Sequence, residues 1–420
     1  MAFQATVNWP MFKGGASRRG FNPSETAISP SNAKNLILKW VGVMGDLVDF
    51  SSPTVVNGVV YIGSFDGKLY AFNADGCGKS MCSPLWSGKT NNSITSSPAV
   101  ADGVVYIGSN DRNLYAFAAN GCGSSTCSPL WTARTGGAID CPPLVVNGVV
   151  YVGSEDGVFY AFAAAGCGQS TCAPIWMATT GRGIDSAPAF ANGVVYFGSG
   201  DGKLYAFNAA GCDTPTCSPL WTAQAGVDID GSSPAVVNGV VYIASFQESS
   251  FSSSRLYAFN ANGCGQPTCQ PLWSALAGDF VQSSPAVAYG MVYIGSGDSL
   301  LYAFNANGCG QPKCTALWTG IATGEQATLI AAPVVANGLV YVGENNGMVE
   351  VYRAKGCGQS SCGPVTQLLT QNEQIVSSSP AVVNGTVYFG SANQDVAPDR
   401  KAIRVPVVSI RIQSPLSRDR

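Results

Sequence analysis

The chain has 420 residues, of which 46% are hydrophobic and only 11% charged, and it contains 50 glycines. This composition is typical of an all-β protein with many tight turns and argues against a helical bundle. The formal charge is −3 and basic residues gather only near the C-terminus, so the electrostatic footprint of a nucleic-acid or anionic-lipid binder is missing. No apolar stretch approaches the roughly 18 residues that span a bilayer, and we expect no membrane span.

Residues 1–35 precede any repeat, and we treat them as an N-terminal extension. The opening, MAFQATVNWP, lacks the basic and apolar regions of a secretory signal. The segment LILKW at residues 36–40 then has the pattern of a strand. Because its Trp40 matches the tryptophan near the end of each later repeat, we predict that this segment supplies the outermost strand of the last repeat and closes a ring.

A unit that opens SSPxVVNGxVYxGS recurs eight times within residues 36–392. A period in the forties with four strand signals per unit is the signature of a β-propeller. The prolines that mark the units are Pro53, Pro98, Pro143, Pro188, Pro234, Pro285, Pro333 and Pro380. The sequence therefore predicts an all-β protein, an eight-bladed β-propeller with four antiparallel strands per blade.

Each unit can be divided into strands by its turns. In the first unit, Thr54–Val56 is apolar and β-branched, and Asn57-Gly58 supplies the two positive-φ residues of a type I′ hairpin before VVYIGS returns. Asp66-Gly67 forms a second turn before LYAF, and a cysteine segment then precedes PLW. These four segments are the four predicted strands of a blade.

The eighth unit departs from this pattern after YFGS, because LYAF, the cysteine segment and the tryptophan are all missing. Residues 393–420 carry nine charges in 28 positions, so we describe them as an atypical C-terminal tail. The alternation in KAIRVPVVSIRI can still pair as a third strand and partly complete blade eight. A truncated or frame-altered end is the alternative.

Fourteen of the 15 cysteines form pairs with the spacing i, i+5, one in each of seven units. Four ligands per zinc cannot be assembled from two cysteines per blade in a chain without histidine, so we predict disulfides and an extracellular or periplasmic location. Cys141 stands alone where most units have serine, and is interpreted as a small buried residue, with a reactive thiol as the alternative. The predicted pairs are Cys77/Cys82, Cys122/Cys127, Cys167/Cys172, Cys212/Cys217, Cys264/Cys269, Cys309/Cys314 and Cys357/Cys362.

The stretch SSPTVVNGVVYIGSFDGKLYAFNA followed by PLW resembles the pyrroloquinoline-quinone (PQQ) repeat of quinoprotein dehydrogenases and of the propeller lipoprotein in bacterial outer-membrane assembly. The resemblance departs at the turn between the third and fourth strands, where GCGxxxC replaces a short Thr-Gly turn. The resemblance to the dehydrogenases implies a quinone site with two adjacent cysteines and a calcium ion held by Glu, Asn and Asp. This chain has no adjacent cysteines, so we expect neither PQQ nor calcium, and a CxxCH haem motif is excluded because histidine is absent.

Connections between blades and the turns between second and third strands share one face of a propeller. The sequence places acidic residues there, at the inner mouth of the channel, and loops of this kind carry function more often than the scaffold does. The plainer interpretation is that these aspartates cap turns. The candidate ligand-binding residues are Asp49, Asp140, Arg182, Asp185 and Asp230.

No catalytic arrangement emerges, because triads that need histidine are impossible and no P-loop or GxSxG motif occurs. We therefore predict a monomeric, non-catalytic binding or scaffolding propeller that contacts a protein or a saccharide. Two alternatives stay open: a PQQ- and calcium-dependent quinoprotein dehydrogenase, and a sensor module of a larger chain.

Overall fold

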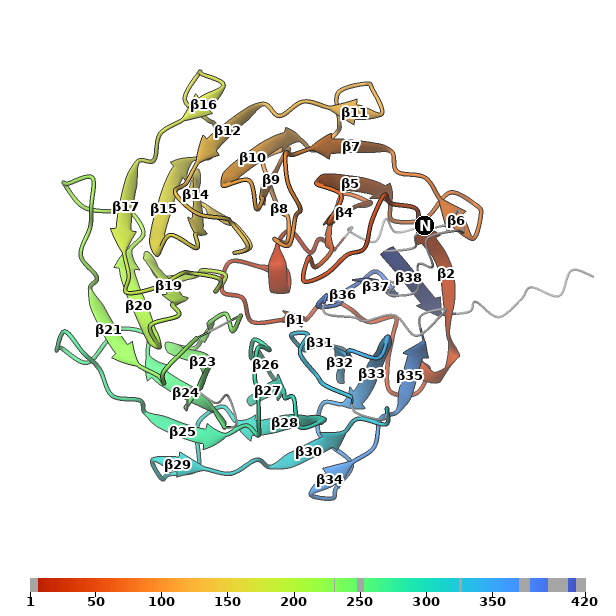
Figure 1. Cartoon of the computed structure of the whole chain (residues 1–420). Helices are drawn as coiled ribbons and strands as arrows, with labels where there is room; N and C mark the ends of the chain where they lie inside the picture. Colours follow the sequence, from red (N-terminus) through yellow and green to blue (C-terminus); the bar gives the residue numbers. More distant parts are fainter. Residues whose placement is uncertain are drawn as a thin grey trace, which may run out of the picture.

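The computed structural model describes residues 7–229, 231–247, 253–324, 327–369, 378–391 and 407–412. Within these residues, eight small sheets stand around one axis as the blades of a β-propeller (Figure 1). The predicted eight-bladed all-β fold is therefore confirmed. In these residues no helix has the length and apolar character needed to cross a bilayer.

The innermost strand of each blade follows the Ser-Ser-Pro signature and is short and apolar, because it lies beside the channel axis. These strands are β3 (Thr54–Val56), β8 (Ala99–Ala101), β13 (Leu144–Val146), β18 (Ala189–Ala191), β22 (Ala235–Val237), β26 (Ala286–Ala288), β31 (Val334–Ala336) and β36 (Ala381–Val383). A two-residue turn follows each of them. In the first, Asn57 and Gly58 have φ of 50° and 77°, as a type I′ turn requires.

The second strands carry the VVYIG pattern and are buried on both faces between neighbouring blades. They are β4 (Val59–Gly63), β9 (Val104–Gly108), β14 (Val149–Gly153), β19 (Val194–Gly198), β23 (Val240–Phe246), β27 (Met291–Gly295), β32 (Leu339–Gly343) and β37 (Thr386–Gly390). The third strands pair antiparallel with them. They are β5 (Lys68–Asn73), β10 (Asn113–Ala118), β15 (Val158–Ala163), β20 (Lys203–Asn208), β24 (Ser254–Asn260), β28 (Leu300–Asn305), β33 (Met348–Arg353) and β38 (Val407–Ile412).

The outermost strands of blades 1 to 7 are β7 (Trp86–Lys89), β12 (Trp131–Arg134), β17 (Trp176–Thr179), β21 (Trp221–Gln224), β25 (Trp273–Leu276), β30 (Trp318–Ile321) and β35 (Thr366–Leu369). Blade 8 takes its outermost strand from the start of the chain. There β2 (Leu36–Gly42) pairs antiparallel with β38 from the end of the chain. The predicted closure by an N-terminal strand is confirmed, and β38 lies in the segment expected to form a third strand.

The cysteine loops do more than connect the third and fourth strands. The second cysteine of a loop lies beside the outermost strand of the preceding blade, and in five loops it forms a two-residue parallel strand there. These strands are β6 (Met81–Cys82), β11 (Thr126–Cys127), β16 (Thr171–Cys172), β29 (Lys313–Cys314) and β34 (Ser361–Cys362). The blades therefore have four or five strands, and the fifth pairing is parallel rather than antiparallel.

The two remaining loops, in blades 4 and 5, make the same contact through a single parallel bridge each. The Cys217 amide donates to the Met177 carbonyl, and the Cys269 amide donates to the Thr222 carbonyl, both at 2.8 Å. The sequence predicts these cysteines only as members of connecting loops, and that interpretation is incomplete. Cys269 is buried at 4% exposure and belongs to the same apolar cluster as Trp221 of the preceding blade. The second cysteine therefore closes its loop and also fills the seam between two blades.

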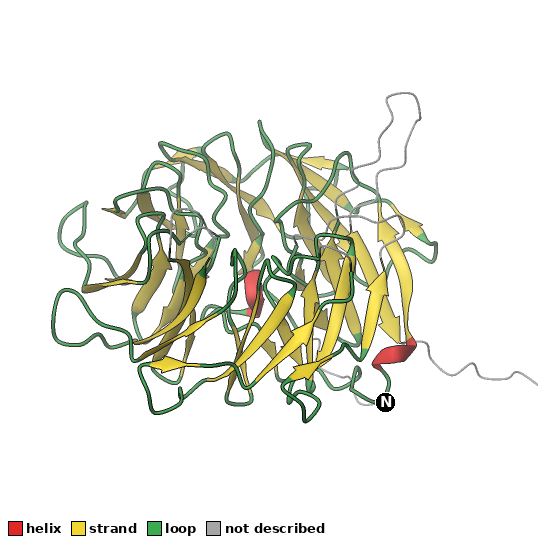
Figure 2. Ribbon diagram, turned by 60° about the horizontal axis from the view of Figure 1, so that its bottom comes forward, coloured by secondary structure: helices red, strands yellow, loops and turns green. Residues whose placement is uncertain are grey.

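All seven predicted cysteine pairs form disulfides, with Cα atoms 5.6–5.7 Å apart. Closing such a short loop contributes about 2 kcal/mol in the chain-entropy model. Because each loop also pairs with the blade before it, the disulfides stiffen the contacts between blades around the outside of the ring. Figure 2 shows the propeller tilted by 60° from the view of Figure 1, with its strands in yellow and the connecting loops in green.

In every blade except blade 7, whose outermost strand β35 has no tryptophan, a tryptophan from the outermost strand packs against the first glycine of the next cysteine loop. Gly121 has φ of +74°, and a methyl group there would lie 2.7 Å from Cδ1 of Trp86. A second contact runs in the same direction, because the tyrosine hydroxyl of the second strand donates to a carbonyl of the next blade, as from Tyr61 to Ala119 at 2.9 Å. The GCGxxxC turn thus preserves tryptophan docking.

The N-terminal extension fills the centre of the propeller. Between Trp9 and Asn22 it includes η1 (Phe12–Gly14) and β1 (Phe21–Asn22), and it crosses the axis (Figure 1). It hydrogen-bonds to the innermost strand of one blade after another through backbone atoms. These bonds involve Trp9 with Val55, Pro10 with Val100, Ala16 with Phe190, Ser17 with Val236, Arg19 with Val287 and Gly20 with Val335.

Arg18 is the buried cation at the middle of this segment. Its guanidinium donates to the carbonyls of Phe12, Pro143 and Pro188 at 2.7–2.9 Å. Burial lowers the pKa of Arg18 to about 9. One side chain thus connects the extension with blades 3 and 4.

The seam between blades 7 and 8 has no cysteine loop in the part of the chain that the structure describes. The extension covers this seam just before η2 (Ala33–Asn35). Glu25 Oε2 accepts from the Gly385 amide of blade 8 at 2.9 Å, and Asn337 of blade 7 donates to the Ile28 carbonyl at 2.8 Å. The extension therefore connects blades 7 and 8, as a cysteine loop connects the other neighbouring blades.

A pair of glycine substitutions tests tryptophan docking. Gly121→Ala should lower the free energy of unfolding by about 2–4 kcal/mol, because the new methyl group meets Trp86 and φ is positive. Gly123→Ala, on the other side of Cys122, also has positive φ but open space around it, and should cost only about 1–2 kcal/mol. Guanidinium unfolding under oxidising conditions measures both. Equal losses would contradict the docking contact.

Replacing Arg18 tests the role of the extension. Arg18→Met leaves three buried carbonyls without their donors and should cost about 2–4 kcal/mol in urea unfolding. Arg19→Met is the control, since Arg19 is only partly buried and its guanidinium lies 4.8 Å from the Phe21 ring. We expect a loss below about 1 kcal/mol there. A similar small loss for both variants would mean that the extension contributes little to closing the channel.

Candidate functional site

In blades 1 to 7, the residue just before the signature that ends in proline lies at the mouth of the channel. These seven residues line one cavity of ≈ 280 Å³, together with residues from the signature itself. Because innermost strands converge toward the axis, equivalent positions of the blades meet there. The seven residues are Phe50, Thr95, Asp140, Asp185, Gly231, Gln282 and Ile330.

The cavity is closed below by the N-terminal extension. Phe12 of η1 lines it with Pro142 and Ala332, and Phe12 and Ala332 belong to one small apolar cluster. Beneath this floor, Lys13 is fully buried and donates to the Pro285 carbonyl. Burial, and then the nearby Arg18, hold the pKa of Lys13 well below its usual value. The mouth is therefore a blind pocket rather than an open pore.

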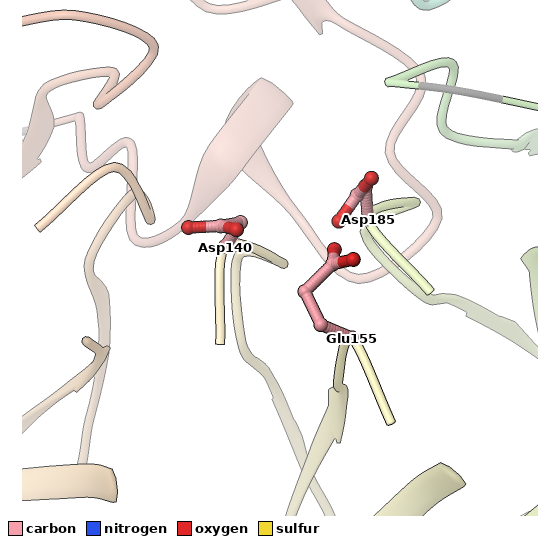
Figure 3. Close-up of side chains that lie close together, drawn as sticks. All are labelled: Asp140, Glu155 and Asp185. Atoms are coloured by element: carbon pink, nitrogen blue, oxygen red, sulfur yellow. The ribbon is translucent and has the colours of Figure 1, made fainter. Parts of the chain in front are cut away.

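Three carboxylates gather on the side of the mouth formed by blades 3 and 4. Asp140 precedes β13, Glu155 follows β14 and Asp185 precedes β18, and one ligand atom from each lies within 4.8 Å of the others. Figure 3 shows the Glu155 side chain reaching toward Asp185. Asp140 and Asp185 are half-buried and Glu155 is exposed. We name Asp140, Glu155 and Asp185 the mouth cluster.

Asp140 is half-buried at the mouth and hydrogen-bonded to a neighbouring blade. The Thr95 hydroxyl donates to its Oδ1, and Asn110 Oδ1 lies 3.2 Å from the same hydroxyl. Burial raises the pKa of Asp140, Thr95 opposes the rise, and the charge of Glu155 adds to it. The ionised carboxylate is therefore held at a cost that a bound cation or a proton would relieve.

Hydrogen bonding around the mouth is interrupted beside this cluster. In five places the second serine of the signature accepts a hydrogen bond from the same backbone position of the preceding blade, as in Ser52 N to Ser97 Oγ at 2.8 Å. Blade 3 has Pro142 instead, which has neither a hydroxyl nor an N–H. The ring of bonds is therefore broken on both sides of blade 3, in the acidic half of the mouth, and again between blades 6 and 7, where Ala332 has no hydroxyl.

The structure brings together two of the five predicted site residues. Asp140 and Asp185 line the cavity, but Asp49 does not, because the connection before blade 1 has one more residue and Phe50, at φ of 63°, occupies the lining position. Arg182 points elsewhere and lies 3.9 Å from Asp228. Asp230 lies outside the described residues.

Sequence analysis missed Glu155. It follows Gly-Ser at the end of the second strand, and this turn shares a face with the connections between blades. Its place in this turn therefore indicated that Glu155 lies on the same face as Asp140 and Asp185. Cys141, next to Asp140, is fully buried as expected, with Sγ 3.2 Å from the Ser186 carbonyl. Burial raises its pKa to about 12, which does not fit a reactive thiol.

The mouth does not fit pyrroloquinoline quinone. This cofactor is a tricarboxylate, and it would have to bind beside three protein carboxylates. The one arginine predicted for the site, Arg182, is paired with Asp228 instead. Oxygen donors that converge in this way fit a hard cation or a cationic side chain.

Comparison with solved structures confirms the fold. BamB from Moraxella catarrhalis is 20% identical with a TM-score of 0.62, over 89% of this chain and 97% of that one. Quinohemoprotein alcohol dehydrogenase from Comamonas testosteroni is 13% identical with a TM-score of 0.72, over 97% and 80%. A europium-containing methanol dehydrogenase is 14% identical with a TM-score of 0.70, over 97% and 98%. At such identities the likeness shows the fold alone.

Sequence comparison identifies the repeat. None of the curated proteins compared with the chain matches it. The profile of one family, described as outer membrane protein assembly factor BamB, matches residues 42–121, 84–169, 167–266 and 211–415. These matches overlap and cover all eight blades. The chain therefore belongs to this family of PQQ-like repeat propellers.

Proposed function

We propose that the protein is a non-catalytic binding propeller, and that its channel mouth receives a cationic side chain of a protein partner. The observation that carries the proposal is the mouth cluster, three carboxylates within 4.8 Å at the edge of a blind cavity. A lysine or arginine that enters the cavity would neutralise them. Partly desolvated ion pairs of this kind give an interface both specificity and affinity.

The size and lining of the cavity favour a side chain over a larger ligand. A volume of ≈ 280 Å³ is at the lower end of small-molecule pockets. Phe50 of blade 1 also lines the cavity, is 48% exposed at the rim and offers an apolar contact for the methylene stem of a lysine or arginine. Similarity to an assembly factor is a further reason to expect a protein partner.

We further propose that the protein acts outside the cytosol as a monomer. Seven disulfides persist only where thiols are oxidised. Formation of all seven in the native protein would be visible as a mass difference on reduction and alkylation.

Peptide binding tests the proposed partner chemistry. The probe is a set of fluorescein-labelled nonapeptides that differ only at the central residue, measured by fluorescence anisotropy. We expect arginine and lysine peptides to bind, and Asp140→Asn/Asp185→Asn to weaken them by at least about tenfold. Asp102→Asn/Asp213→Asn is the matched control, because it removes the same charge from exposed turns on the opposite face.

Four results would overturn the proposal or replace the partner class. The first is equal binding of glutamate and arginine peptides, and the second is an equal loss in the control variant. The third is turnover: saturable binding of PQQ with Ca²⁺ and dye-linked alcohol oxidation would establish the dehydrogenase alternative. Saturable binding of a neutral oligosaccharide with no peptide binding would replace the partner class.

The stability of Asp140→Asn separates a binding role from turn capping. The pKa of Asp140 is raised in the folded state, so the carboxyl stabilises the fold when protonated, and this stabilisation is lost as pH rises through the raised pKa. At about pH 7, Asp140→Asn should therefore raise the free energy of unfolding by about 0.5–1 kcal/mol. At about pH 3 the gain should vanish. A loss of stability at pH 7 would favour the capping role.

A further inference from the structure

Blade 7 differs from the other blades at three buried positions that act together. The residue after the second strand is serine in blades 1 to 6 but Glu344 in blade 7. On the third strand, tyrosine and phenylalanine are replaced by Glu350 and Tyr352. The equivalent residues are Ser64, Ser109, Ser154, Ser199, Ser245 and Ser296; Tyr70, Tyr115, Tyr160, Tyr205, Tyr257 and Tyr302; and Phe72, Phe117, Phe162, Phe207, Phe259 and Phe304.

Strand pairing places the three side chains on one face of blade 7. Glu350 of β33 pairs with Val342 of β32, and residues two positions apart on a strand share a face. Glu344 follows Val342 by two positions, and Tyr352 follows Glu350 by two. This face packs against blade 6, because a methyl group at Gly320 of β30 would lie 2.7 Å from Cε1 of Tyr352.

All three side chains are fully buried, but their oxygens are only partly hydrogen-bonded. Glu350 Oε1 accepts from the Thr323 amide at 3.2 Å, the Thr323 hydroxyl at 2.7 Å and Gln367 Nε2 at 3.1 Å. Among the described residues, no hydrogen-bond partner of ordinary geometry exists for Glu350 Oε2, for either carboxylate oxygen of Glu344, or for the Tyr352 hydroxyl. The Glu344 carboxyl nevertheless interacts with the side chains of Glu350 and Asn346.

Four unpartnered oxygens in one buried place are costly. A buried carboxylate whose oxygens lack partners is destabilising, and here Glu350 is hydrogen-bonded through Oε1 only. Burial, and then Glu350, raise the pKa of Glu344 well above that of an ordinary glutamate. Burial and both carboxylates also raise the pKa of Tyr352. Positive charge placed among these buried oxygens would lower the cost of burying them.

We propose that Glu344, Glu350 and Tyr352 form a buried Ca²⁺ site between blades 6 and 7. The available donors are all oxygens, which suits a hard cation rather than zinc or copper. Two carboxylates balance the charge of a divalent ion. Ca²⁺ also accepts irregular geometry and bidentate carboxylates, whereas Mg²⁺ demands a near-ideal octahedron. The site is separate from the mouth cluster, which belongs to blades 3 and 4.

The blade itself provides the test variant. Glu344→Ser/Glu350→Tyr/Tyr352→Phe gives blade 7 the residues that blades 1 to 6 have at these positions. Glu344→Gln is a milder second variant that keeps the shape of the side chain. Asp140→Asn/Asp185→Asn is the control, because it removes charge from the mouth cluster and leaves blade 7 unchanged.

Isothermal titration of the EDTA-treated, oxidised full chain with CaCl₂ measures the site, and the midpoint of thermal unfolding with and without Ca²⁺ is the second readout. We expect Ca²⁺ to bind the wild type and the control and to raise their unfolding midpoints. Both blade 7 variants should lose at least about tenfold in affinity, and the triple variant should lose the thermal shift.

Any of three outcomes would overturn the site: no saturable Ca²⁺ binding by the wild type, undiminished binding by Glu344→Gln, or complete loss of binding in the mouth-cluster control. The first would mean that a proton shared by the two glutamates suffices to neutralise them. The last would assign the cation to the mouth. The first result would leave the peptide-binding proposal undecided, because that proposal concerns Asp140 and Asp185 rather than blade 7. The last would place a cation on the same two residues, where it would compete with the peptide.

Discussion

The contact between a tryptophan and the glycine of the next blade is the constraint on which the rest of the structure depends. The glycine is held at positive φ, and no side chain fits between it and the indole. Each blade can therefore bury its outer tryptophan only if the next blade is in place. Seven such contacts follow one another around the ring. The one that uses Trp40 of β2 joins blade 8 to blade 1, and the pairing of β2 with β38 brings together the two ends of the propeller.

A ring that closes in this way leaves a space at its axis, and the N-terminal extension fills it. The innermost strands are rich in small residues, so they approach the axis without meeting. Their inward N–H groups would lack partners, but the extension supplies carbonyls one blade after another. The same segment that fills the channel also gives the mouth its floor through Phe12.

The repeated parts of the fold could be predicted from the sequence because each depends on a short local motif, and that motif occurs eight times. Asn57-Gly58 predicts its hairpin wherever it occurs, and Trp40 indicates the closing strand. The path of residues 7–35 could not be predicted, since it depends on eight separate strands and has no repeat. At the candidate site, too, some residues could be predicted and others could not. Asp140 and Asp185 could be placed by register, whereas one additional residue before Ser51 moved Asp49 away from the cavity.

Variation within such a scaffold has a simple physical meaning. Equivalent positions have the same backbone and differ only in side chain, so a substitution in one blade changes the chemistry at one point of a fixed ring. At the mouth, acids occur in blades 3 and 4, next to the place where Pro142 interrupts the serine hydrogen bonds. In blade 7, three buried positions change together. Since one buried carboxylate would only destabilise the seam, the joint change of Glu344, Glu350 and Tyr352 is better explained by a shared ligand than by drift at independent sites.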